Sequence, residues 1–262
     1  MVPLRTIVPN LVTSMAACAG ITSISLSSEG RFLHALVALL VACVCDGMDG
    51  RIARLLKASS KLGAELDSLA DFVNFGVAPA MFMFYWLTGG PAHEGCSPQM
   101  VRLVLGCSLF YALCDCFRLA RFNTMLEQPT LPYWKHFFLG VPAPGGCWMV
   151  LTPVLLALSV KDLAPMLRHP ACAMFMLGLV GILMASRLPT ISLKSIRLTK
   201  QYMLPTMALL LLLVAFLCTH FWLTLGVVGA GYLATVPFVG LIFLKIKARY
   251  LRANRPQEQS AA

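Results

Sequence analysis

The chain has 262 residues, of which 58% are hydrophobic and only 12% carry a charged side chain. Its mean hydropathy of +0.78 excludes a soluble globular domain of this size and predicts a protein that crosses the membrane several times. The net charge of +10 does not indicate a nucleic-acid-binding protein, because the basic residues fall between hydrophobic runs.

Eight hydrophobic stretches follow one another along the chain, and each is close to the length needed to cross about 30 Å of hydrocarbon. The expected fold class is therefore all-α, a polytopic helical membrane protein. We expect one integral membrane domain over residues 1–250 and a polar cytoplasmic tail over residues 251–262. The predicted helices cover residues 7–26, 32–52, 64–88, 99–121, 142–160, 168–186, 203–220 and 222–245.

Lysine and arginine predict the orientation of these helices, because cytoplasmic loops carry an excess of both residues. With both termini in the cytoplasm, all but four of the 21 basic residues lie on the cytoplasmic side. The four exceptions are Arg31, Arg102, Lys161 and Arg168. The cytoplasmic ends of the second and third helices then lie on the same side of the membrane.

Four aspartates lie at these two helix ends, in the run CDGMDGRIARLLKASSKLGAELDSLAD from Cys45 to Asp71. Asp46 and Asp49 are three residues apart and Asp67 and Asp71 are four apart, so each pair shares one helix face. Acidic residues in membrane segments are costly and usually functional. Clustered carboxylates favour hard divalent cations such as Mg²⁺ or Mn²⁺ and suit a two-metal phosphoryl-transfer site.

The acidic cluster is also compatible with two different roles. The aspartates could form buried ion pairs with Arg51 or Arg54, although both arginines lie in a region with cytosol available. They could instead line the path of a divalent-metal or proton transporter. The outer halves of the second and third helices, which contain HALVALLVA and FMFYWL, are apolar and argue against such a path.

The spacing of the run resembles the signature of the CDP-alcohol phosphotransferase family. The specified positions are Asp46, Asp49, Gly50, Ala53, Arg54, Gly63, Asp67 and Asp71. Enzymes of this family transfer a phosphatidyl or related group from a CDP-linked donor to an alcohol. The resemblance implies a six-helix catalytic core, a homodimer, and two divalent cations, Mg²⁺ or Mn²⁺, on the aspartates.

Four further blocks are similar to the bacterial membrane-bound phosphatidylserine synthases of this family: GAELDSLADFVNFGVAPA, RLARFN, FFLGVPAPGG and MASRLPTISLKSIR. This likeness implies CDP-diacylglycerol and L-serine as substrates, membrane lipids around the protein, and the bacterial inner membrane as its location. One departure is Ala16, because many relatives carry an asparagine there, after the PN-x-x-T element. Another acceptor, such as glycerol 3-phosphate, inositol phosphate or choline, remains the alternative.

The resemblance also implies residue roles. Asp46, Asp49, Asp67 and Asp71 would bind the metals, with Asp67 and Asp71 catalytic and Asp71 the general base toward the serine hydroxyl. CDP-diacylglycerol would bind at Asn10, Thr13, Gly50, Arg54, Gly63 and Ala64.

The serine carboxylate needs a cationic partner, and several basic or polar residues lie on the expected cytoplasmic side. The alternative role for each basic residue is anchoring at the membrane surface. Asp115 could pair with Arg118 or face the serine ammonium, and the sequence does not choose between these roles. The candidates for serine binding are Arg118, Arg121, Asn123, Arg187 and Lys194.

Overall fold

The computed structural model describes residues 4–58, 60–89, 97–125, 137–186, 189–191 and 202–253. Almost all of these residues are helical, as the sequence predicts. The helices in chain order are α1 (Leu4–Ser28), α2 (Phe32–Leu55), α3 (Lys61–Asp71), η1 (Phe72–Val77), α4 (Ala78–Thr88), α5 (Pro98–Met125), α6 (Ala143–Ser159), η4 (Lys161–Leu163), α7 (Ala164–Leu167), α8 (Pro170–Ala185), α9 (Met203–Thr219) and α10 (Phe221–Ala253).

Each of the eight predicted spans coincides with a helix or, for residues 64–88, with the unbroken run of α3, η1 and α4. Within the described part of the chain, α1, α2, α5 and α10 are long and apolar enough to cross a membrane. A fifth span results if α6 and the following η4–α7 segment count as one, although they are bent by 119°. The chain is therefore a polytopic helical membrane protein with four to five spans by these criteria, fewer than the eight expected.

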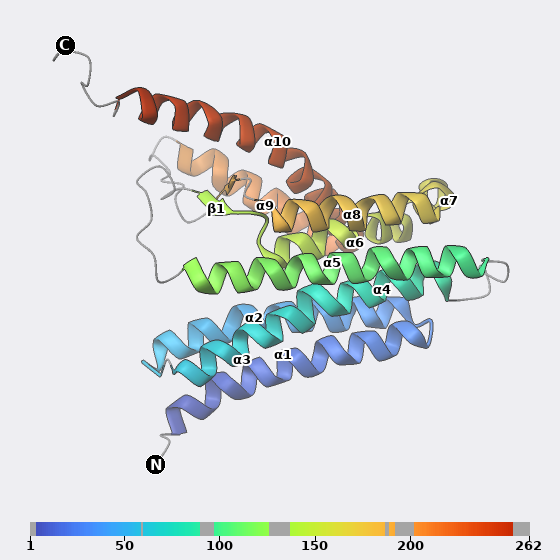
Figure 1. Ribbon diagram of the computed structural model, residues 1–262, viewed down its shortest axis with the longest axis horizontal. Helices are drawn as coiled ribbons and strands as arrows, with labels where there is room; N and C mark the ends of the chain where they lie inside the picture. The colour runs from blue at the N-terminus through green and yellow to red at the C-terminus, as the bar shows by residue number, and fades with distance from the viewer. Residues whose placement is uncertain are drawn as a thin grey trace, which may run out of the picture.

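The helices lie roughly along one common direction, with α1 to α4 on one side of α5 and α6 to α10 on the other (Figure 1). The start of α1, the α2–α3 connection, the end of α5 and the end of α10 all lie at one end of the molecule (Figure 1). The α1–α2 turn and α7 lie at the opposite end. The segments expected to be cytoplasmic are therefore gathered at one end.

The core is made mainly by α4, α5, α6 and α8, with α2 and η1 also contributing buried side chains. Its largest fully buried side chains include Phe82, Tyr111, Leu151, Leu155 and Leu177. In contrast, α9 contributes no buried residue, and its apolar side chains face outward all round. Such a surface is suited to contact with lipid rather than with water.

The third predicted span is interrupted by η1, a π-helical turn that begins directly after Asp71. Pro79 follows in the first turn of α4, and proline has no N–H to donate to the carbonyl four residues earlier, that of Phe75. The Tyr111 hydroxyl donates to this Phe75 carbonyl oxygen at 2.8 Å instead. This bond joins α5 to η1 close to the acidic site, and π-helical turns are frequent at functional sites.

A pair of three-residue strands, which the sequence did not predict, lies among the described helices. β1 (Phe137–Leu139) pairs antiparallel with β2 (Pro189–Ile191), with Phe138 opposite Thr190. The two strands precede α6 and follow α8, so the pair brings those two connections together. It lies at the same end of the molecule as the end of α5 (Figure 1).

Candidate active site at the acidic ends of α2 and α3

The acidic run folds as the spacing predicts, with Asp46 and Asp49 in the last turns of α2 and Asp67 and Asp71 on α3. One carboxylate oxygen from each of Asp46, Asp49 and Asp67 lies within 4.8 Å of the others. The Asp71 carboxyl group lies within hydrogen-bonding distance of that of Asp46. All four predicted carboxylates therefore meet at one place.

No ion pair joins the cluster to a basic side chain within the part of the chain that the structure describes. Neither ion pair found there involves any of the four aspartates. Arg51 and Arg54, the partners considered from the sequence, are both exposed. Asp49 is only 4% exposed, and a buried charge is expensive unless it is paired or coordinates a metal. A set of oxygen ligands of this kind fits one or more hard divalent cations.

Helix α1 closes the site from the other side. The buried Thr13 hydroxyl donates to Asp49 Oδ2 at 2.6 Å, which joins α1 to α2. Asn10, one turn earlier, faces α3, where a Cβ placed on Gly63 would lie 2.8 Å from Asn10 Oδ1. Gly63 therefore leaves room for the Asn10 side chain, which a larger residue at this position would displace.

A pocket of about 150 Å³ opens beside the carboxylates, between α1, α2 and the start of α3. It includes Asn10, Thr13, Gly50, Gly63 and Ala64, five of the six residues predicted to bind CDP-diacylglycerol. Apart from its chain neighbours and the backbone of its own helix, nothing lies within 4 Å of a Cβ built on Gly50, so this wall of the pocket is open. The full lining is Pro9, Asn10, Thr13, Asp49, Gly50, Ala53, Ala58, Ser60, Gly63, Ala64 and Asp67.

Two residues that the sequence analysis connected with this pocket, Arg54 and Ala16, do not line it. The exposed Arg54 side chain does not line the pocket, and its Nε donates to the Gly50 carbonyl oxygen at 3.0 Å. Ala16, the departure noted in the sequence, is fully buried and does not line it either. Sequence reasoning missed Ser60, whose hydroxyl accepts from Gly63 N at 3.0 Å and caps α3. A serine just before a helix start is a recognisable signal for this role.

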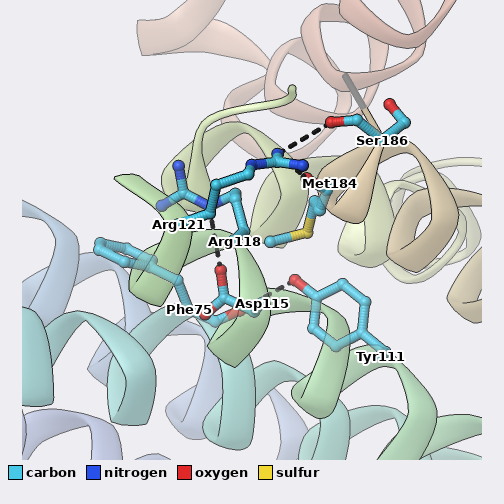
Figure 2. Close-up of polar contacts among 7 residues, drawn as sticks. All are labelled: Phe75, Tyr111, Asp115, Arg118, Arg121, Met184 and Ser186. Carbon is cyan, nitrogen blue, oxygen red and sulfur yellow. Dashed lines mark hydrogen bonds and ion pairs between the residues drawn. The ribbon is translucent and has the colours of Figure 1, made fainter. Parts of the chain in front are cut away.

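The Asp115 question that the sequence left open is answered by an ion pair with Arg118. Arg118 Nε lies 3.3 Å from Asp115 Oδ1 (Figure 2). Asp115 is fully buried and Arg118 is 9% exposed. The positive charge of Arg118 also lies close enough to the Asp71 carboxyl group to interact with it. Of the two predicted serine-binding arginines that the structure describes, Arg118 is thus the one whose charge reaches the acidic cluster.

Arg121 points elsewhere, although it lies only three residues beyond Arg118. Its guanidinium donates to the carbonyl oxygens of Ala185 at 2.7 Å, Ser186 at 2.9 Å and Met184 at 3.4 Å (Figure 2). These carbonyls end α8 and lack partners within the helix, so Arg121 caps the helix. Gly140, with a φ of +76°, passes close to this contact.

The remaining predicted serine-binding residues divide into two groups. Asn123 is exposed, and its Nδ2 donates to Ser68 Oγ at 3.0 Å, which links the end of α5 to α3. Arg187 and Lys194 lie outside the described residues. The structure therefore brings Arg118 and Asn123 to the α3 side of α5, and directs Arg121 to α8.

Comparison with known proteins agrees with this geometry. The family model for CDP-alcohol phosphatidyltransferase matches residues 6–184. A protein of Mycobacterium leprae named CDP-diacylglycerol–serine O-phosphatidyltransferase is 34% identical over 88% of this chain and 74% of its own length. Its namesake from Mycobacterium tuberculosis strain H37Rv is 33% identical over 88% and 77%. One from Bacillus subtilis is 32% identical over 60% and 84%.

Proposed function

The chain belongs to the CDP-alcohol phosphatidyltransferase family, and we propose that it transfers the phosphatidyl group of CDP-diacylglycerol to the hydroxyl of L-serine. The products are phosphatidylserine and CMP. The observation that carries this proposal is the group of three carboxylates within 4.8 Å of one another, beside a pocket at the end of a membrane helix bundle. Such a site can hold a charged headgroup while the acyl chains stay in lipid.

The aspartates would hold two divalent cations, Mg²⁺ or Mn²⁺. Asp46, Asp49 and Asp67 supply the clustered oxygens, and Asp71 adds a fourth carboxylate next to Asp46. The chemistry that such cations supply is neutralisation of charge on the phosphoryl oxygens and on the departing CMP. Thr13 holds the Asp49 carboxylate in place from α1.

The reaction needs one proton acceptor and one nucleophile. We assign the acceptor to Asp71, which takes the proton of the serine hydroxyl while Asp67 stays a ligand. The serine oxygen forms a bond to the phosphatidyl phosphorus, and the bond from that phosphorus to the bridging oxygen breaks. The bonding electron pair leaves with CMP, so the transfer needs no covalent enzyme intermediate.

The cytidine diphosphate part of the donor would occupy the pocket between α1, α2 and α3. Asn10 and Thr13 offer polar side chains there, and Gly50, Gly63 and Ala64 leave room for the diphosphate. Arg54 would meet a phosphate only after its side chain moves from the Gly50 carbonyl. Serine would approach from the α5 side, where Arg118 can bind its carboxylate.

The setting of this site is also part of the proposal. We place the protein in a bacterial inner membrane, with both termini and the active site in the cytoplasm, where serine and CMP are soluble. The bacterial relatives support the location. The gathering of the expected cytoplasmic segments at one end of the molecule supports the orientation (Figure 1). Membrane lipids would surround the outward-facing α9, and a homodimer is the proposed assembly.

The test is CMP release from CDP-diacylglycerol by the purified protein in detergent, with Mg²⁺ or Mn²⁺. L-serine, glycerol 3-phosphate, inositol phosphate, choline and no acceptor are compared in parallel. Release that requires both a metal and L-serine is the expected result. Release with another alcohol would keep the family chemistry and reject serine. No release with any acceptor, from folded protein that binds the metals, would reject the enzymatic function.

A further inference from the structure

We propose that Asp115 is a positioning residue that sets acceptor specificity, because it holds Arg118 in the orientation that receives the serine carboxylate. This inference rests on the proposed function and adds to it a residue that touches neither substrate. Asp115 lies in the middle of α5, fully buried, where an acidic side chain is costly. Its only hydrogen-bond partner among the described residues is Arg118.

The geometry of the pair leaves the two terminal nitrogens of the Arg118 guanidinium available for a ligand. Asp115 Oδ1 takes the inner nitrogen, Nε, and the two terminal nitrogens lie on the side away from Asp115 (Figure 2). No hydrogen bond from these terminal nitrogens is found among the described residues. Two parallel N–H donors on a planar guanidinium match a carboxylate.

The position of Arg118 relative to the acidic cluster suits its two terminal N–H groups to binding the acceptor carboxylate. Arg118 is close enough to Asp71 for their charges to interact, so an acceptor carboxylate bound by Arg118 lies near the proposed base. Serine carries its hydroxyl two bonds from the carbon that bears the carboxylate. A clamp on the carboxylate therefore restricts where the hydroxyl can lie. Choline has no carboxylate and gains nothing from this contact.

Packing rather than hydrogen bonding holds the second carboxylate oxygen of Asp115. Its Oδ2 has no partner among the described residues and lies against Gly76 of η1, where an added Cβ would be 2.8 Å away. One turn earlier on α5, Tyr111 donates to the Phe75 carbonyl next to Gly76. The π-helical turn and the absence of a side chain at Gly76 thus create the space that Asp115 occupies.

Arg121 provides an internal comparison for this role. Both arginines are on α5 and both are largely enclosed, but Arg121 uses its terminal nitrogens on the carbonyls that end α8. An arginine that serves only to join helices is expected to be used in this way. Arg118 instead is held through Nε by a buried carboxylate, which leaves its terminal nitrogens available for a ligand.

The first experiment measures KM for L-serine and for CDP-diacylglycerol with the full-length protein in detergent. Asp115→Asn removes the charge that holds Arg118 and is expected to raise the serine KM about tenfold, the usual scale for a charge-assisted hydrogen bond. The KM for CDP-diacylglycerol is expected to stay within about twofold, because the donor pocket lies on α1 to α3. An unchanged serine KM in folded Asp115→Asn would overturn the inference.

A double-mutant cycle separates positioning from a general structural effect. If Asp115 acts through Arg118, adding Asp115→Asn to Arg118→Gln causes little further rise in the serine KM. Additive effects of the two substitutions would contradict the proposal. Ser23→Ala is the matched control, since it removes a buried hydrogen bond to the Ala35 carbonyl of α2, which is not part of the Asp115–Arg118 arrangement. It is expected to lower the melting temperature and leave the serine KM within about twofold.

Gly76→Ala tests the positioning role of Asp115 without changing any charge. It serves as the deciding variant if Asp115→Asn does not fold. The added methyl group displaces Asp115 Oδ2 and is expected to raise the serine KM in the same direction. An unchanged serine KM in folded Gly76→Ala would then reject the role of Asp115. If the unmodified protein does not use serine at all, the proposed function fails first. If it does and these variants keep the serine KM, only the positioning role fails.

Discussion

The acidic ends of α2 and α3 and the basic end of α5 lie side by side but are built in different ways. At the acidic end, residues from one run of 27 positions converge, because helical spacing pairs them on α2 and on α3 and the two helix ends are close in sequence. At the basic end, Arg118 and Arg121 are equally close in sequence but have unrelated partners. Helical spacing therefore predicts which side chains share a helix face, but it does not predict their partners on distant helices.

This contrast suggests a division of work. In the proposed function the acidic end carries the groups that perform the transfer, and Thr13 of α1 holds one of them in place. The basic end joins α5 to η1 and α8, so several of its polar groups stabilise the fold, whereas the charge of Arg118 reaches Asp71. Substitutions at the two ends should therefore change different kinetic constants.

The largest expected effect is that of Asp71→Asn, which removes the proposed proton acceptor and one carboxylate. A general base contributes about 10²–10⁴-fold to a rate, so kcat for CMP release is expected to fall by at least about 10²-fold. The measurement is serine-dependent CMP release, with the melting temperature as a control for folding. Near-normal turnover by folded Asp71→Asn would remove the base assignment.

The next effect is on donor binding through Gly63. In Gly63→Ala the added Cβ would lie 2.8 Å from Asn10 Oδ1 and 3.1 Å from Ser60 Oγ, so the Asn10 side chain, which lines the donor pocket, must shift. Displacements of about 1 Å near a reacting group can cost up to about 10²-fold, and the KM for CDP-diacylglycerol is expected to rise by at least about tenfold. Gly106→Ala is the control, because no other residue lies within 4 Å of a Cβ built there. Equal effects of the two substitutions would contradict the placement of the donor.

A smaller effect is expected from Thr13→Val, which keeps the shape of the side chain and removes its bond to Asp49. A hydrogen bond to a charged group is worth about 1.5–3 kcal/mol, so metal affinity should weaken by about tenfold or more. Titration of Mn²⁺ against activity and against direct binding measures this change. Ser14→Ala is a control on the exposed face of the same helix. Unaltered Mn²⁺ affinity in Thr13→Val would show that α1 does not orient the carboxylates.

The smallest effect on catalysis is expected from Arg121→Gln. Three carbonyls at the end of α8 lose their charged donor, so the free energy of unfolding should fall by about 1–3 kcal/mol. The serine KM is expected to change much less than it does in Arg118→Gln. Thermal denaturation and serine titration of both variants check this difference. A larger serine effect at Arg121 would reverse the roles of the two arginines.

The sequence predicted the helices and the acidic cluster because both depend on local periodicity. The positions of Asp46, Asp49 and Asp67 follow from one helical turn on each of two adjacent helices. The partners of Arg121 lie 63 to 65 residues away, and no local pattern encodes such contacts. The π-helical turn was also missed, although Pro79 after FVNFG is the signal that a carbonyl there needs another donor.

The partner of Asp115 also could not be predicted from local spacing, although Arg118 is only three residues away. Its spacing from Arg118 permits an ion pair on one helix face, but also permits each side chain to face a ligand. Only the packing of η1 against α5, with Gly76 opposite Asp115, decides between these options. The short β1–β2 pair is similar, because each strand has three residues and their pairing depends on where α5 and α8 end.

We propose that the acidic end performs the transfer while Arg118 selects the acceptor. A parallel titration of L-serine and CDP-diacylglycerol with the unmodified protein, Asp67→Asn and Arg118→Lys tests both roles together. We expect Asp67→Asn to lose turnover at every serine concentration, and Arg118→Lys to regain most of its turnover at high serine with an unchanged CDP-diacylglycerol KM. Turnover in Asp67→Asn that high serine restores, or loss in Arg118→Lys that serine does not relieve, would contradict the account.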